Sequence, residues 1–269
     1  MPEGHTLHRL ATELSTAFGD RAVASSSPQG RFIDGAALVD GRVLTGAEAW
    51  GKHLLVAFDG LVDQVHVHLG LYGSWVIGAA RPVVGQVRWR LANATATADL
   101  RGPTACEFLD PGAVDSLLAR LGPDPLRADA DLDRAWRRLS TSRTSVAALL
   151  MDQRVLAGVG NVYRAELLFR HRVDPDTPGR ELDHSIWSAM WADLVGLMRA
   201  GERTGRIDTV RAEHEPEAMG REPRVDDHGG EVYVYRRADL PCLVCGRPIS
   251  RRVLAGRNLF WCPGCQHGL

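Results

Sequence analysis

Four cysteines near the end of the chain restrict the possible folds more than any other feature. Cys242 and Cys245 are separated by two residues, as are Cys262 and Cys265, and sixteen residues lie between the pairs. Each pair directs two thiolates at one tetrahedral metal ion, so the spacing predicts a zinc site without an open position for catalysis. We expect one structural Zn²⁺ per chain, stiffening a β-hairpin. Two disulfides or a rubredoxin-like iron site are the competing interpretations.

The remaining sequence shows two kinds of periodicity, which together predict an α+β protein. Residues 6–17 carry apolar side chains at helical spacing, and short alternating runs between glycines over residues 42–109 predict a β-sandwich or barrel. Two prolines and a glycine within residues 121–125 predict a linker. Helical spacing then returns, and we expect helices at residues 131–139, 145–151, 161–169 and 183–200. The expected domains are a β-sandwich (1–120), a helical domain (121–230) and a zinc finger (231–269).

Charge is unevenly distributed, although the net charge is only −1. Between residues 236 and 257 there are six arginines and one acidic residue, which is typical of a phosphate-binding module but also of a solvated basic face. Residues 211–230 are acidic and rich in proline and glycine, and we expect a mobile loop there. No apolar run is long enough to span a bilayer and the start lacks a secretory pattern, so we expect a cytoplasmic protein with no membrane partner.

The basic residues are 31 arginines and a single lysine, Lys52. Arginine stays protonated in proteins, whereas lysine can lose its proton and act as an acid, a base or an amine nucleophile. A position that needs lysine chemistry is therefore one interpretation. Chance survival in an arginine-biased composition is the other.

A second candidate site is the predicted start of a helix that directly follows two glycines. Gly158 and Gly160 precede Asn161, which we expect to be the N-cap of the next helix. Free backbone N–H groups and the positive end of a helix dipole suit a phosphate. The helix expected at residues 145–151 makes this a helix–turn–helix-like pair. An ordinary capped helix is the alternative.

The chain starts with Met1, Pro2, Glu3 and Gly4. Proline in second place permits removal of the initiator methionine, which leaves a secondary amine at Pro2. An α-amino group has a pKa of about 7.7–8.0, so a useful fraction is nucleophilic at neutral pH. Glu3 is a candidate proton donor beside it. A frayed terminus without a role is the competing interpretation.

Taken together, these motifs carry a family resemblance over essentially the full length. The opening Met-Pro-Glu-Gly, the Gly51-Lys52-His53 turn, the stretch 158–169 and the cysteine module occur in the same order in the formamidopyrimidine-DNA glycosylase/endonuclease VIII family. The chain resembles most the endonuclease VIII-type members. The resemblance implies a bifunctional DNA glycosylase/AP lyase of base-excision repair, with a helix–two-turns–helix in the helical domain. It also implies damaged DNA, duplex or single-stranded, as the partner of a monomer associated with the nucleoid.

The resemblance also implies roles for individual residues. Pro2 would be the Schiff-base nucleophile at C1′ of the sugar, and Glu3 the proton donor. Lys52 matches the lysine that the family needs for base removal and β-elimination. Asn161 would hold a backbone phosphate, and Arg257 would grip phosphate and support δ-elimination, so that base removal, expected for oxidised pyrimidines, ends in β,δ-elimination.

Two apolar residues complete the expected site. Leu71 and Tyr72 match the void-filling loop of the endonuclease VIII branch, which enters the duplex when the damaged base is extruded. Ordinary packing at a strand end is the alternative for both. The chain also departs from the family: Thr6 stands where many members have glutamate, and Arg101 is followed by Gly102 and Pro103 in place of an aromatic wedge.

Two other function classes compete with this interpretation. A non-catalytic zinc-finger DNA-binding protein would use the same cysteines and phosphate-binding helix with an inert Pro2. A small-molecule enzyme with an N-terminal proline, such as a tautomerase, would leave the zinc module and the helix start without a role.

Overall fold

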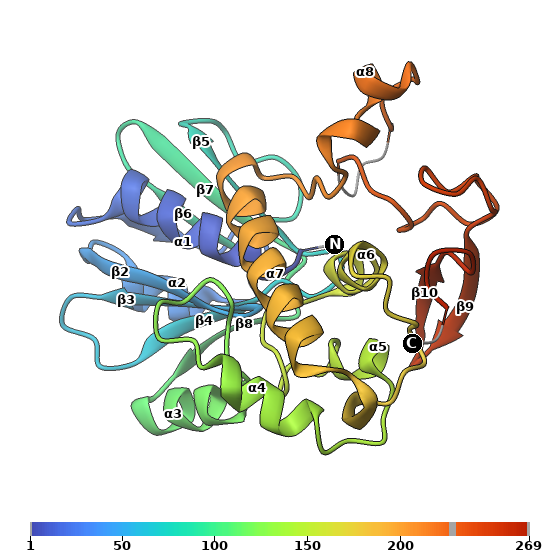
Figure 1. Cartoon of the computed structure of the whole chain (residues 1–269). Coiled ribbons are helices and arrows are strands. Elements are labelled where there is room, and N and C mark those ends of the chain that lie inside the picture. The colour runs from blue at the N-terminus through green and yellow to red at the C-terminus, as the bar shows by residue number, and fades with distance from the viewer. Residues whose placement is uncertain (1, 226–229, 268–269) are drawn as a thin grey trace. The chain divides into compact units, whose positions relative to one another are not determined.

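The computed structural model describes residues 2–225 and 230–267, and the chain divides into two compact units, residues 1–120 and 121–269. Figure 1 shows the course of the chain. Each unit has its own hydrophobic core. None of the described helices is long and apolar enough to cross a lipid bilayer. The helical segment and the cysteine segment share the second core, and a separate domain boundary at residue 230 stays a prediction.

The first unit contains eight strands and three helices within its described residues. They are α1 (Gly4–Phe18), β1 (Ala24–Ser26), α2 (Ile33–Val39), β2 (Leu44–Trp50), β3 (His53–Phe58), β4 (Gln64–His68), β5 (Ser74–Ala79), β6 (Trp89–Ala92), β7 (Ala96–Arg101), β8 (Ala105–Leu109) and α3 (Pro111–Arg120).

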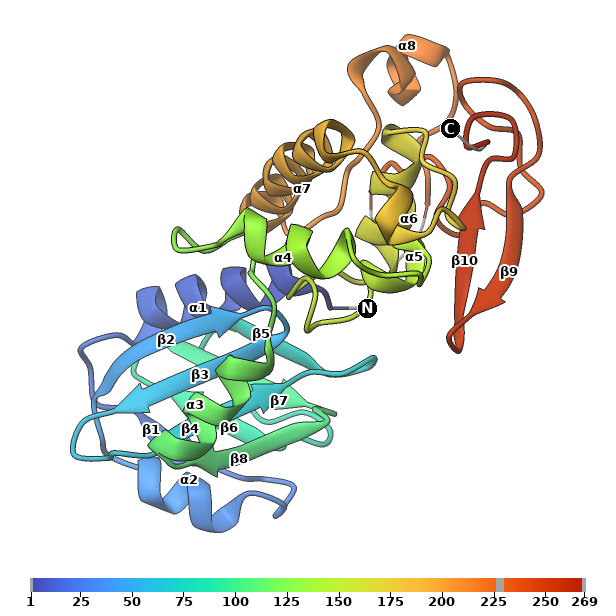
Figure 2. The ribbon, with the colours of Figure 1, turned by 60° about the horizontal axis from the view of Figure 1, so that its bottom comes forward.

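The strands form two antiparallel four-stranded sheets with the orders β1-β6-β7-β5 and β2-β3-β4-β8 (Figure 2). Alternate residues of both sheets, such as Val65 and Val67 in one and Leu91 in the other, are fully buried in a common core. The period-2 pattern therefore places one face of each sheet inward. The expected β-sandwich is confirmed, and α1 adds its apolar face to the same core.

The second unit is helical at first and ends in a hairpin. Its elements are α4 (Leu132–Leu139), α5 (Val146–Leu149), α6 (Asn161–Arg170), η1 (Gly179–Glu181), α7 (His184–Thr204), η2 (Ala212–His214), α8 (Pro216–Met219), β9 (Ser250–Leu254) and β10 (Arg257–Trp261). The four expected helices are all present, although the second is a single turn. Asp131 and Asp183 cap α4 and α7 with their carboxylates, which fixes where these helices begin.

Two details differ from the expectations. The segment at residues 121–125 is buried. Its close packing is clearest at Gly122, where an added Cβ atom would lie 2.4 Å from the Val155 carbonyl oxygen. These residues therefore pack within the second unit and do not form an exposed linker. The segment 211–230, expected as a loop, contains η2 and α8 in its described part, since Pro216 suits the first turn of a helix. Residues 226–229 lie outside the described residues.

Candidate active site and metal centre

The start of the chain places a buried carboxyl directly beside Pro2. Pro2 is half-buried, whereas Glu3 is completely buried and immediately precedes α1. The Glu3 carbonyl accepts a hydrogen bond from the Thr6 N–H at 2.9 Å, but its side chain does not cap the helix. Burial lowers the pKa of the neighbouring His5 to about 4, so this imidazole is neutral at pH 7. The Glu3 carboxyl is thus held next to the predicted nucleophile and does not serve as a helix cap.

Lys52 lies at the tip of the hairpin between β2 and β3. Trp50 pairs with His53, so only Gly51 and Lys52 form the turn. Gly51 has a φ of +59°, which glycine adopts without strain and which is typical of the first turn residue in a type II′ hairpin. The sequence Gly51-Lys52 therefore places the single lysine at a strand end.

Two imidazoles near Lys52 remain uncharged at neutral pH. Burial, and then the neighbouring His68 and His66, lower the pKa of His53 to about 3. Burial likewise lowers the pKa of His68, with His66 contributing next. The positive charge of Lys52 contributes less to both shifts than burial and the neighbouring imidazoles do.

The turn after β4 exposes the two residues expected to enter DNA. Leu71 is 46% exposed and Tyr72 is 91% exposed. Such large apolar surface has no packing role in the free protein, which excludes ordinary strand-end packing for Tyr72. Gly73 closes the turn with a hydrogen bond of 3.0 Å to the Leu69 carbonyl.

The beginning of α6 and the cysteine hairpin meet within the second unit. Gly160 is the N-cap, so the expectation that Asn161 caps the helix is wrong by one position. Asn161 is the first helical residue, and its side-chain amide donates to the Asn258 carbonyl at 2.9 Å. Arg164 donates to the same carbonyl at 3.0 Å and also bonds the Asn161 amide oxygen. Arg257, the exposed first residue of β10, therefore lies one residue away from a backbone carbonyl contacted by the helix start.

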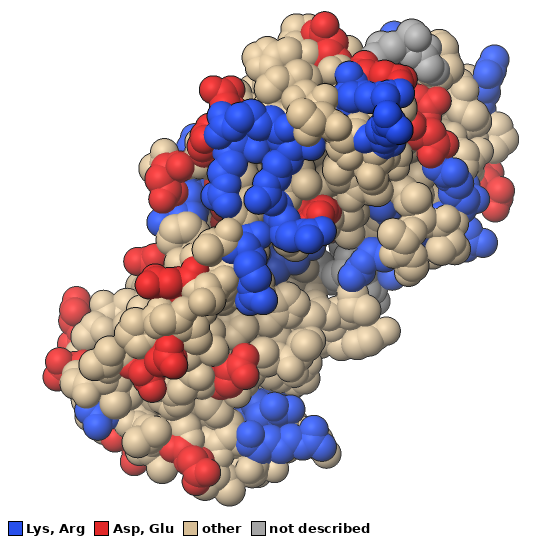
Figure 3. All heavy atoms as spheres, turned by 90° about the horizontal axis from the view of Figure 1, so that it is seen from below, with Lys and Arg blue, Asp and Glu red and all other residues tan. Residues whose placement is uncertain are grey.

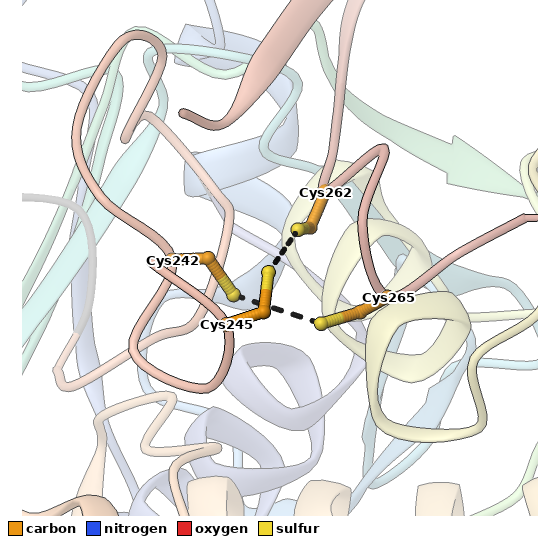
Figure 4. Close-up of side chains that lie close together, drawn as sticks. All are labelled: Cys242, Cys245, Cys262 and Cys265. Atoms are coloured by element: carbon orange, nitrogen blue, oxygen red, sulfur yellow. Dashed lines mark hydrogen bonds between the residues drawn. The ribbon is translucent and has the colours of Figure 1, made fainter. Parts of the chain in front are cut away.

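The four cysteines converge from the two knuckles, as Figure 4 shows. All four sulfurs lie within 4.8 Å of one another, with Sγ–Sγ distances of 3.9 Å for Cys242 and Cys265 and of 3.4 Å for Cys245 and Cys262. Tetrahedral Zn–S bonds of about 2.3 Å require sulfurs about 3.8 Å apart, so the arrangement fits Zn²⁺. Both Sγ–Sγ distances are far longer than an S–S bond of about 2.05 Å, and no disulfide joins any of the five cysteines, so the geometry contradicts the two-disulfide interpretation. The fifth, Cys106, has a pKa raised by burial to about 12 and is no candidate nucleophile.

Two buried side chains connect these elements, and one of them, Glu166, was not singled out from the sequence. Gln266 accepts from the Cys262 N–H at 2.9 Å and donates to the Val173 carbonyl at 3.0 Å, which ties a zinc knuckle to the helical segment. Glu166 on α6 binds backbone N–H groups at residues 233–235. The position of Gln266 directly after Cys265 was a signal for such a role, whereas Glu166 looks like an ordinary helix residue.

Positive charge is concentrated in patches on the surface, although the protein as a whole is nearly neutral. On the face drawn in Figure 3, lysine and arginine side chains gather in patches, and acidic side chains lie beside several of them, although the net charge is only −1. The hairpin adds Arg251, Arg252 and Arg257 at exposed positions. Clustered cations of this kind are what phosphate binding needs.

Family models match nearly the whole chain. Residues 1–106 match the formamidopyrimidine-DNA glycosylase N-terminal domain, residues 121–212 the H2TH domain of the same enzymes, and residues 239–268 the zinc finger found in FPG and IleRS. The chain belongs to the formamidopyrimidine-DNA glycosylase/endonuclease VIII family. It is therefore a base-excision repair enzyme of the DNA glycosylase/AP lyase class with a zinc finger.

Individual members of the family are similar over their full length. Endonuclease 8 1 of Mycobacterium tuberculosis (strain ATCC 25618 / H37Rv) is 53% identical over 276 residues, covering 99% of this chain and 100% of the relative. Formamidopyrimidine-DNA glycosylase of Thermus thermophilus is 33% identical, covering 99% and 97%. The crystal structure of MutM (FPG) from the same organism superposes with a TM-score of 0.74 at 30% identity over 98% of both chains. Lactococcus lactis Fpg bound to DNA containing an abasic site, at 19% identity over 98% of this chain and 99% of that chain, has the same fold with a TM-score of 0.78.

The structure shows the surroundings of the residues that depart from the family pattern. The Thr6 hydroxyl lies 3.3 Å from the His5 ring, on the first turn of α1. Arg101 donates to the buried carboxylate of Asp99 at 2.9 Å, and Gly102 turns the chain with a φ of +55°. The position after Arg101, where an aromatic wedge was the alternative, is therefore a glycine in a turn.

Proposed function

We propose that this enzyme excises oxidised pyrimidines from DNA through a Schiff base on Pro2 and then cuts the strand by β,δ-elimination. The observation that carries the proposal is the buried carboxyl of Glu3 beside Pro2, in a chain whose only other amine is Lys52. An imine intermediate requires an amine nucleophile. An α-amine with a pKa near 8 is unprotonated at neutral pH about two-hundredfold more often than a lysine with a pKa near 10.4. Pro2 is therefore the better nucleophile of the two.

The proposed reaction uses each site residue once. The Pro2 nitrogen bonds to C1′ while the bond between C1′ and the damaged base breaks, and the hydrogen lost from the Pro2 nitrogen protonates the leaving base. Glu3 donates a proton to the ring oxygen as the sugar opens to an iminium. Loss of a C2′ proton then expels the 3′ phosphate, and loss of the C4′ proton in a second elimination expels the 5′ phosphate. Water hydrolyses the iminium and restores Pro2. In this scheme Lys52 assists base removal and β-elimination, and Arg257 holds phosphate during δ-elimination.

Binding would rest on the phosphate-contacting elements and on the exposed turn. Asn161 and Arg257 lie close together within the second unit and would hold backbone phosphates. Leu71 and Tyr72 would fill the space left by the extruded base, which their exposure permits. Zn²⁺ would hold the hairpin that carries Arg257 in shape. The enzyme would act as a monomer, which light scattering tests.

The substrate class rests on similarity to Endonuclease 8 1 and on the fold shared with Lactococcus lactis FPG in complex with an oxidized pyrimidine containing DNA. A panel of oligonucleotides with defined lesions, single- and double-stranded, tests it. Excision restricted to oxidised purines would contradict the pyrimidine assignment. Comparison of the two strand forms decides whether duplex DNA is preferred.

Borohydride reduction tests the chemical mechanism, because it converts an iminium into a stable enzyme–DNA adduct. We expect the enzyme lacking Met1 to be trapped on DNA with an abasic site, and Pro2→Gly to be trapped much less. Lys52→Arg should retain DNA binding but lose turnover, since arginine keeps the charge without releasing a proton. Equal trapping of Pro2→Gly and wild type, or trapping of a protein that retains Met1, would refute the Pro2 mechanism. An absence of any adduct would favour a non-catalytic DNA-binding protein.

A further inference from the structure

A chain of hydrogen-bonded side chains crosses three strands beside Lys52. His53 on β3, His66 on β4 and Glu107 on β8 lie on the face of their sheet opposite to the core residues Leu54 and Val67. The His53 Nδ1 is 2.9 Å from the His66 Nε2, and the His66 Nδ1 is 3.2 Å from a Glu107 carboxylate oxygen. The two rings are stacked with their centroids 5.2 Å apart. We call these three side chains the histidine relay.

The end of the relay at Glu107 determines where its protons lie. A carboxylate only accepts hydrogen bonds, so the His66 Nδ1 carries a hydrogen and donates it. In the neutral ring the His66 Nε2 is then an acceptor, which requires the His53 Nδ1 to donate. His53 is left with its Nε2 as an acceptor. Glu107 thus fixes both tautomers and holds the two rings in one orientation.

The relay is neutral at its buried end and open to solvent at its other end. The His66 side chain is 7% exposed, whereas the Glu107 side chain is 55% exposed and borders a cavity of about 480 Å³ that α3 lines with Ser116 and Arg120. Burial lowers the pKa of His66, although Glu107 opposes this shift. The charged and titratable groups beside the relay include Lys52, His68 and Arg120, and Glu48 on β2 lies on the same face of the sheet opposite Leu55.

The geometry of the relay differs from that of a metal site. Across the described parts of the chain, only the cysteine cluster brings three or more potential ligand atoms close enough to hold one ion. In the relay each ring nitrogen that faces a neighbour is used in a side-chain hydrogen bond. The side chains are therefore connected in series and do not converge on a common centre.

The relay ends at the residue that forms the base of the Lys52 turn. His53 directly follows Lys52 and pairs with Trp50 across the two-residue turn. Lys52 directly precedes His53 in this turn, so the position of its backbone is coupled to that of His53. A neutral, hydrogen-bonded His53 fixes the turn without adding a second positive charge beside the ammonium.

We propose that the histidine relay positions Lys52 for its part in the reaction, with Glu107 as the anchor, His66 as the link and His53 as the contact to the turn. These are positioning residues, since they act through Lys52. The inference rests on the proposed function, in which Lys52 takes part in base removal and β-elimination. Displacement of a reacting group by about 1 Å costs up to a hundredfold in rate, so loosening the turn should slow the chemical steps more than DNA binding.

Two pairs of variants test the relay. Glutamine at position 66 supplies both a donor N–H and an acceptor oxygen, so His66→Gln preserves the relay, whereas His66→Leu breaks it. In the same way Glu107→Gln keeps an acceptor for His66, and Glu107→Leu removes it at a position where the side chain is 55% exposed. Gln64→Leu is the matched control, because it places leucine on the same strand outside the relay.

The measurements are the single-turnover rate of strand cleavage on duplex DNA with an abasic site, the DNA dissociation constant and the thermal unfolding midpoint. We expect both leucine variants of the relay to cleave about tenfold more slowly, with DNA binding changed less than about twofold. Both glutamine variants and Gln64→Leu should stay within about threefold of wild type. Equal rates for His66→Leu, Glu107→Leu and wild type would overturn the proposal.

A double-mutant cycle decides whether the relay acts through Lys52. In a Lys52→Arg background, His66→Leu should have little further effect on the remaining single-turnover cleavage or on borohydride trapping, because the positioned group is gone. If His66→Leu slows Lys52→Arg by the same factor as wild type, the relay only supports the sheet and the proposal is wrong. Failure of the proposed function itself would look different, because the wild-type enzyme would then neither trap nor cleave.

Discussion

Glu166 is a completely buried carboxylate on α6 that binds four donors from two distant segments. One oxygen accepts from the Val234 N–H at 2.9 Å and the Tyr235 N–H at 2.8 Å. The other accepts from the Thr209 hydroxyl at 2.6 Å and the Tyr233 N–H at 2.7 Å. Residues 233–235 lead directly into the zinc finger, so Glu166 connects the helix that presents Asn161 to the module that presents Arg257. We predict that Glu166→Gln, a substitution of nearly the same shape, strongly destabilises the second unit.

The size of the expected loss in stability can be worked out from the four hydrogen-bond donors of Glu166. Glutamine keeps one acceptor oxygen but replaces the other oxygen with an NH₂ group. The least costly arrangement places this NH₂ group at the oxygen that Thr209 and Tyr233 bind, because the Thr209 hydroxyl can rotate and accept a hydrogen bond from it. The Tyr233 N–H is then buried without a partner, which costs about 1–3 kcal/mol. The two hydrogen bonds from the Val234 and Tyr235 N–H groups remain, but their acceptor is now neutral instead of charged, so each bond becomes weaker by about 1 kcal/mol. The expected loss is about 4 kcal/mol, a large part of the roughly 5–15 kcal/mol that stabilise a typical domain.

Urea unfolding of the zinc-loaded protein measures this loss. Tryptophan fluorescence reports the second unit, where four of the seven tryptophans lie at positions 136, 187, 191 and 261. Glu217→Gln is the matched control, because Glu217 is exposed on α8 and the same exchange there should change stability by no more than about 0.5 kcal/mol. A loss below about 1 kcal/mol for Glu166→Gln would refute the reasoning, since it would mean that the four donors find other partners.

Three further predictions concern the metal, the phosphate contact and acid stability. Removal of Zn²⁺ by a chelator should abolish DNA binding, because the hairpin that carries Arg257 loses its support; unchanged binding in an electrophoretic shift assay would contradict this. Arg257→Ala should weaken binding to all sequences and reduce the slope of log K against log salt by about 1, and an unchanged slope would show that Arg257 touches no phosphate. Burial alone would raise the pKa of the Asp193 carboxyl, but hydrogen bonds from His171 and Arg170 outweigh it and hold that pKa well below its usual range. This stabilisation is complete above the unfolded pKa near 3.9 and disappears as pH falls through the lower folded value, so Asp193→Asn should be less stable than wild type at pH 7 but nearly equal in strong acid, as measured by urea unfolding at both pH values.

Elements with a strong local signal could be predicted from the sequence. The amphipathic α1, the alternating strands and the capped helices α4 and α7 begin and end within a few residues of the expected positions, and the cysteine spacing predicted the metal site. The helix α3 was missed although its signal was present. Asp110 accepts from the Ala113 N–H as an N-cap, and Pro111 suits the first helical position. The seven-residue α2 has too short a periodicity for any reliable prediction.

Side-chain contacts between distant segments could not be predicted. His66 and Glu107 are 41 residues apart, Glu166 and Val234 are 68 apart, and Asn161 and Asn258 are 97 apart. Each contact depends on strand register or on the packing of one element against another, neither of which a local pattern contains. The sequence therefore pointed to Asn161, Lys52 and the cysteines individually. It left undetected the side chains that hold them in place.

The use of arginine elsewhere in the chain sharpens the interpretation of Lys52. Two carboxylates are held by the fork of a guanidinium, with paired bonds of 2.6 and 2.9 Å from Arg90 to the buried Asp99 and of 2.7 Å each from Arg170 to the partly buried Asp193. Lys52 lies at a hairpin tip, next in the chain to His53, whose imidazole is kept neutral by burial. A positive charge alone would be supplied equally well by arginine, the residue that this composition prefers at 31 other positions. What distinguishes lysine there is its ability to release a proton, so the Lys52→Arg variant separates the contribution of charge from that of proton transfer.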